Sequence, residues 1–101
     1  MIRHLTVEVL CHWSVDPPSY RIFVDNDLIT ERTFGWAGYQ FYVKESIAVD
    51  VAAGMHNLRL ENLGPNGKFT LRNMTVDSNA NQEIFLKYHD NLIDWNFACH
   101  Q

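Results

Sequence analysis

The chain has few of the residues that mark several large protein classes, and cysteine is the first of them. Only two cysteines, Cys11 and Cys99, occur among its 101 residues. Two are too few for the disulfide scaffold of a small secreted domain. The expected state is a pair of free, buried thiols, and one disulfide between them is the alternative.

Positive charge is also scarce. Eight lysines and arginines stand against twelve aspartates and glutamates, so the formal net charge is −4. The cations are scattered singly along the chain, whereas a protein that binds nucleic acid carries a basic stripe. We therefore expect no nucleic-acid partner.

Long apolar runs are missing. None reaches the roughly 20 residues that a membrane-spanning helix requires. The first eight residues alternate between polar and apolar side chains, unlike the continuous apolar segment of a signal peptide. The sequence therefore predicts no membrane partner and no export.

Catalytic motifs are missing as well. The sequence contains no G-x-S-x-G nucleophile motif, no H-E-x-x-H zinc motif and no glycine-rich phosphate loop. Its five histidines are separated along the chain. We expect no catalytic residues and no enzymatic activity.

What the sequence does contain is a regular alternation of apolar and polar side chains. Apolar residues form 47% of the chain, and most recur at every second position, the period of a half-buried β-strand. Segments of this kind occupy residues 5–13, 20–24, 28–34, 39–51, 56–61, 68–76 and 83–88. The pattern predicts an all-β chain, since no stretch favours a helix.

Two local features refine this prediction. Asp25, Asn26 and Asp27 separate two strand segments, and such residues tolerate the left-handed backbone of a hairpin turn. The segment 39–51 is long for one strand, so we predict a break or β-bulge near Lys44, Glu45 and Ser46. Together, about seven or eight short strands predict a single-domain antiparallel β-sandwich, jelly-roll-like, over residues 1–101.

Three segments resemble parts of jelly-roll carbohydrate-binding modules, above all the calcium-dependent modules that bind xylan. Residues 20–28 follow their strand–turn–strand pattern, residues 53–60 resemble their P-G-x-H-x-L-x-V strand, and residues 69–77 resemble their closing strand. Ala53 stands in place of the family's proline, and Ser78 in place of its last glycine. The chain also looks similar to decoration and fibre proteins of tailed phages. The resemblance implies the sandwich fold.

Asp25 and Asp27 are the candidate metal ligands. Calcium takes six to eight hard oxygen ligands, often from loops, and further oxygens are available in residues 61–62 and 77–79. The alternative is that these residues serve their turns. No other cofactor is expected.

Aromatic residues supply the candidate binding surface. Trp36, Tyr39 and Tyr42 could stack on a sugar or contact a partner protein. Residues 90–101 form an apolar tail that contains Trp95 and Phe97. This tail is either a lid on the core or a docking segment for a partner.

We therefore expect a non-catalytic structural or interaction protein, such as a decoration or cement subunit on the surface of a phage virion. Its partners would be protein subunits of a larger assembly or copies of itself. The expected location is the virion surface or the cytoplasm of the producing cell. The alternative is a carbohydrate-binding module that binds a glycan, with calcium as a candidate cofactor. A polar groove beside the aromatic residues would favour sugar, and a flat apolar patch would favour protein.

Overall fold

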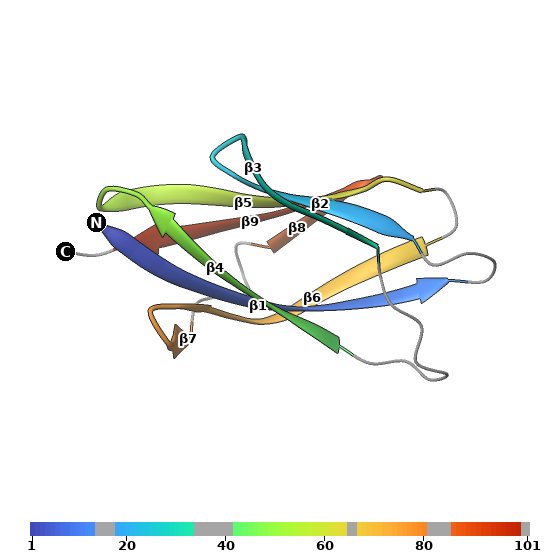
Figure 1. Ribbon diagram of the computed structural model, residues 1–101, viewed down its shortest axis with the longest axis horizontal. Helices are drawn as coiled ribbons and strands as arrows, with labels where there is room; N and C mark the ends of the chain where they lie inside the picture. The colour runs from blue at the N-terminus through green and yellow to red at the C-terminus, as the bar shows by residue number, and fades with distance from the viewer. Residues whose placement is uncertain (14–17, 34–41, 65–66, 81–85, 100–101) are drawn as a thin grey trace.

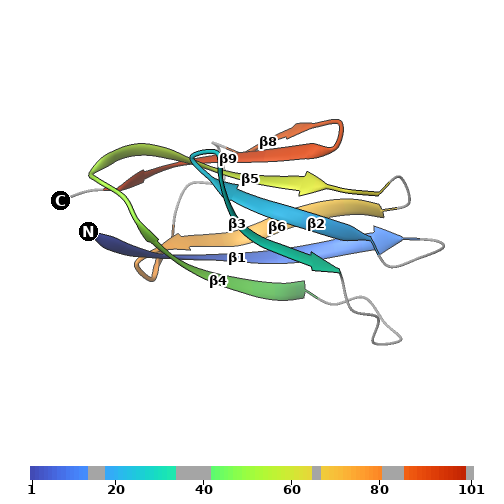
Figure 2. The same cartoon turned by 45° about the horizontal axis from the view of Figure 1, so that its top comes forward.

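The computed structural model describes residues 1–13, 18–33, 42–64, 67–80 and 86–99. These residues form two antiparallel sheets packed face to face, so the predicted β-sandwich is confirmed. Figures 1 and 2 show the two layers, with the start of the first strand and the end of the last strand at the same end of the molecule. Among the described residues, no helix is long and apolar enough to cross a membrane.

The first sheet contains four strands in the order β4-β1-β6-β7. Its strands are β1 (Ile2–Trp13), β4 (Tyr42–Asp50), β6 (Gly67–Val76) and β7 (Asn79–Ala80). The two-residue β7 pairs only with Thr75 and Val76. The beginning of β6 therefore has a described strand on one side only, β1.

The second sheet contains five strands in the order β3-β2-β5-β9-β8. Its strands are β2 (Ser19–Val24), β3 (Asp27–Thr33), β5 (Gly54–Asn62), β8 (Leu86–His89) and β9 (Leu92–Cys99). Across the described residues the two sheets thus hold eight strands of at least four residues, plus the short β7. Consecutive strands repeatedly change sheet, so the chain crosses between the two layers several times.

Alternation along each strand builds the core between the sheets. In β1 the side chains of Leu5, Val7, Val9 and Cys11 are all at most 1% exposed. The second sheet contributes the buried residues Tyr20, Ile22, Val24, Leu58, Leu60, Ile93, Trp95, Phe97 and Cys99. Burial of this apolar surface is the main stabilising contribution to the fold.

The predicted break in β4 is wrong. β4 pairs with β1 without a register shift from Asp50 to Tyr42. Register shifts lie instead between β2 and β3, at Ile22 and Phe23, and in β6, where the pairing with β1 shifts between Thr6 and Glu8. Asn73 has a φ of +53° there. Asparagine tolerates this left-handed backbone better than most residues, so it accommodates the extra residue of the bulge.

Strand β4 stays regular because its inward-facing Glu45 finds polar partners in the other sheet. Glu45 is only 4% exposed. Its carboxylate accepts hydrogen bonds from the Tyr20 hydroxyl (2.9 Å) and from the Arg32 guanidinium (Nε at 2.5 Å, Nη2 at 3.2 Å). A buried carboxylate with such donors is tolerated where an unpaired one would not be.

Candidate functional site

The β2–β3 hairpin turn is confirmed, and it shows what Asp25 does. Asp25 and Asn26 have φ values of +49° and +71°, the signature of a tight two-residue hairpin turn. The Asp25 carboxylate accepts hydrogen bonds from the Asn57 backbone N–H (2.9 Å) and from His56 Nδ1 (2.6 Å). Asp25 thus links the turn to β5 by these two side-chain hydrogen bonds.

His56 is held on both sides of its ring. Its second nitrogen, Nε2, lies 2.7 Å from the carbonyl oxygen of Ala52. Burial lowers the pKa of His56, but the hydrogen bonds to Ala52 and Asp25 raise it by more, so the net shift is upward. Because both nitrogens face acceptors, the imidazole is structural and has no free nitrogen to act as a general base.

The structure places no further candidate carboxylate ligand for calcium beside Asp25 and Asp27 among the described residues. In the part of the chain that the structure describes, no group of three or more His, Cys, Asp or Glu side chains could hold a metal ion. The contacts of Asp25 match the alternative, in which these residues serve the turn.

The predicted aromatic platform is only partly visible. Trp36 and Tyr39 lie outside the described residues. Tyr42 is half-buried at the start of β4, and the guanidinium carbon of Arg72 lies 3.3 Å from its ring centroid. One face of this ring is therefore covered by a cation–π contact and is closed to a sugar.

The prediction that Trp95 and Phe97 contact a partner is wrong. Both side chains are 0% exposed, and their ring centroids lie 4.7 Å apart in the core. They belong to β9, which pairs with β5 on one side and with β8 on the other. Residues 92–99 of the predicted apolar tail are thus an interior strand of the second sheet, and residues 100–101 lie outside the described part of the chain.

The two cysteines are buried thiols that form no disulfide with each other, as expected. Burial raises the pKa of Cys11 to about 11 and also raises that of Cys99. Thiols with raised pKa values are poor nucleophiles at neutral pH, so these residues act as core side chains.

A polar hollow lies on the outer face of the second sheet, with a volume of about 510 Å³. Its central group is Asp94, which accepts hydrogen bonds from the Arg59 guanidinium (2.8 and 3.3 Å) and from the Asn57 amide (3.2 Å). The Arg59 hydrogen bond is the main reason that the pKa of Asp94 is lowered. Most polar groups at the centre of this polar hollow are therefore already paired with one another.

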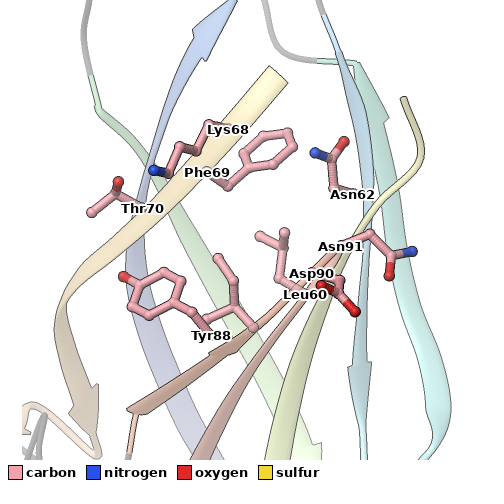
Figure 3. A pocket seen from close by; sticks show the side chains of 9 residues that line it. Leu60, Asn62, Lys68, Phe69, Thr70, Tyr88, Asp90 and Asn91 are labelled. Carbon is pink, nitrogen blue, oxygen red and sulfur yellow. The ribbon is translucent and has the colours of Figure 1, made fainter. Parts of the chain in front are cut away.

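A second hollow opens between the two sheets, and Figure 3 shows it from close by. Its volume is about 340 Å³. We call it the edge pocket, because it lies between the turn from β8 to β9 and the beginning of β6, which has β1 as its one described neighbour strand. The edge pocket is lined by Leu60, Asn62, Lys68, Phe69, Thr70, Tyr88, Asp90, Asn91 and Ile93. No sequence motif marks this pocket, because it forms only where residues 60–70 and residues 88–93 are brought together by the fold.

Strand β3 forms one edge of the second sheet, and β8, beside the edge pocket, forms the other edge. All β3 side chains except the half-buried Thr30 are exposed, among them Leu28 at 56% and Ile29 at 40%. β3 pairs with β2 alone among the described strands. A row of its backbone N–H and C=O groups therefore faces away from the sheet.

Comparison of the chain with protein-family models, with curated proteins and with solved structures finds no match.

Proposed function

We propose that the protein is a non-catalytic subunit of a larger assembly, such as the surface of a phage virion, and that it attaches through the free edge of β3. The observation that carries this proposal is that every β3 side chain except Thr30 is exposed, Leu28 and Ile29 included. An exposed edge strand can accept a strand from another chain, because main-chain hydrogen bonds supply affinity and side chains supply specificity.

The charged residues of β3 support this proposal. Charges on an edge strand usually discourage pairing with other chains. Here Glu31 accepts a hydrogen bond from Arg21 on the neighbouring strand at 2.5 Å, and Arg32 turns inward to Glu45. Two of the three charged side chains of β3 are thus paired within the domain, and the third, Asp27, lies at the end of β3 beside the hairpin turn.

The β3 edge replaces the contact that the sequence suggested. With Trp95 and Phe97 in the core, the apolar tail does not supply a docking surface. The alternative function, a calcium-dependent carbohydrate-binding module with a Trp36, Tyr39 and Tyr42 platform, stays a prediction. The Arg72 contact on the Tyr42 ring argues against it.

The test is co-sedimentation with particles from the organism that encodes the protein. Wild-type protein is expected in the high-mass fractions of a density gradient. Ile29→Lys should reduce that fraction at least about tenfold, because burying an unpaired ammonium in a strand contact costs more than about 1.4 kcal/mol.

The matched control is Met55→Lys. Met55 is 61% exposed but lies on β5, between β2 and β9. This variant should co-sediment as the wild type does. Wild-type protein that stays in the low-mass fractions under all conditions contradicts the proposed function.

A further inference from the structure

The edge pocket has the two kinds of surface that a sugar ring needs. Its floor is apolar, formed by the buried side chains of Leu60, Phe69 and Ile93. Its rim is polar, formed by side chains of β5, β6 and the turn from β8 to β9 (Figure 3). A volume of about 340 Å³ is at the small end of the roughly 300–1,000 Å³ that is typical of ligand sites.

The rim has unused hydrogen-bonding capacity. Lys68, Thr70, Asp90 and Asn91 all line the pocket. Within the described part of the chain, none of their side chains has a hydrogen bond or an ion pair. This distinguishes the edge pocket from the polar hollow, where Asp94, Arg59 and Asn57 already bind one another.

The residues that line the pocket are held in place by contacts with one another and with neighbouring residues. The Phe69 ring packs edge-on against Tyr20, with ring centroids 5.2 Å apart. The Asn62 backbone N–H donates to the Asn91 carbonyl at 2.7 Å, which joins the end of β5 to the β8–β9 turn. The Leu71 N–H donates to the Tyr88 hydroxyl at 3.4 Å, which joins β6 to β8. A site held in this way loses less entropy when it binds a ligand.

From these features we propose that the edge pocket binds one pyranose ring of a neutral glycan. The apolar floor receives the C–H face of the ring. The free amide, hydroxyl, ammonium and carboxylate groups of the rim bind its hydroxyls. Among the described residues that line the pocket, Lys68 is the one cation and Asp90 the one anion, so this lining has no net charge to select a phosphate or a uronic acid.

The edge pocket lies towards the β8 edge of the second sheet, and β3 forms the opposite edge of that sheet. The glycan proposal therefore goes beyond the proposed function, and either can fail alone. If both hold, the subunit gives the assembly that carries it an affinity for polysaccharide.

The test is an NMR titration of the isotope-labelled protein with methyl pyranosides of glucose, xylose, mannose and galactose, and with glucuronate. At least one neutral sugar is expected to shift the amide signals of Asn62, Tyr88 and Asn91 in a saturable manner. Lys68→Ala and Asn91→Ala should each weaken that binding about fivefold, which corresponds to the loss of one hydrogen bond.

The matched control is Lys87→Ala. Lys87 neighbours Tyr88 in β8 but lines the polar hollow on the other face of the sheet, so its loss should leave sugar binding unchanged. The proposal is overturned by any of three results. These are an absence of shifts with every sugar, shifts confined to the polar hollow, or tighter binding of glucuronate than of all neutral sugars.

Discussion

The hydroxyl of Tyr20 and the carboxylate of Glu45 meet across the sandwich at 2.9 Å. Tyr20 belongs to β2 in the second sheet and Glu45 to β4 in the first, so this hydrogen bond joins the two layers inside the core. Burial, together with the neighbouring carboxylate, raises the pKa of Tyr20, which keeps the phenol protonated and able to donate. The pair also fixes the register of β4, because it gives an inward-facing charge a defined partner.

Tyr20→Phe should lower the free energy of unfolding by about 2 kcal/mol. It removes a hydrogen bond to a charged group, and such bonds contribute about 1.5–3 kcal/mol. Urea denaturation measures the change. Tyr88→Phe is the matched control, because Tyr88 is 53% exposed and its hydrogen bond is long, at 3.4 Å. A Tyr20→Phe variant as stable as the control would show that the bond across the sheets is unimportant.

His56 predicts a pH dependence of stability. Its folded pKa lies above its ordinary value of about 6.5, so its protonated form is favoured in the fold. The stabilisation is fully present below about pH 6.5 and is lost as the pH rises through the folded pKa. Urea denaturation across this window should show a His56→Gln variant whose deficit against the wild type shrinks with rising pH.

The pKa of His56 can also be measured directly by NMR. Asp25→Asn removes the charged partner and should lower that pKa towards its ordinary value, whereas Asp27→Asn should leave it unchanged. A wild-type pKa at or below 6.5 would contradict the upward shift.

The bulge at Asn73 predicts which substitutions it tolerates. Asn73→Val should cost about 1–2 kcal/mol, since a β-branched residue resists a φ of +53°. Asn73→Gly should cost less, although it also removes the hydrogen bond from Asn73 to Glu8. Ser46→Val, at an exposed position of the regular β4, should be close to neutral. Equal stability of the Val and Gly variants at position 73 would argue against backbone strain.

Because Trp95 is fully buried, its substitution should destabilise the fold and not merely weaken the binding of a partner. Trp95→Ala should destabilise the domain by about 3–5 kcal/mol, the usual range for a fully buried aromatic residue. This is much of the stability of a small domain, so circular dichroism should show partial or complete unfolding. A Trp95→Ala variant with wild-type stability would return residues 92–99 to the role of a docking segment.

The sequence predicted the fold well because alternation reports burial directly. Every second residue from Leu5 to Cys11 in β1 and from Tyr20 to Val24 in β2 is buried, as the patterns indicate. The hairpin at Asp25 was predictable because few residue types adopt its backbone. The bulge was placed in the wrong strand because Glu45 looks like an interruption, and its partners Tyr20 and Arg32 come from another sheet. The bulge could have been predicted from β6, where the buried positions change from odd numbers to even numbers between Leu71 and Met74.

The candidate sites were less predictable, for a physical reason. The edge pocket is formed by β5, β6, β8 and β9, and nothing local marks Asn62, Lys68 or Asn91 as neighbours. Trp95 and Phe97 were considered for a docking surface because large apolar residues are concentrated in residues 90–101. Ile93, Trp95 and Phe97 alternate with Asp94 and Asn96, however, which is the pattern of a half-buried strand. Asp94 is only 9% exposed and is paired with Arg59 on the outer face of the sheet.

Hydrogen–deuterium exchange of the isolated protein and of the same protein within its assembly tests the β3 interface most directly. An edge strand that gains a partner strand gains protection, because its outward N–H groups become hydrogen-bonded. The account predicts that assembly slows exchange in residues 27–33 and leaves β8, the opposite edge of the second sheet, unchanged. Protection confined to β8, or unchanged exchange in residues 27–33 within the assembly, would contradict it.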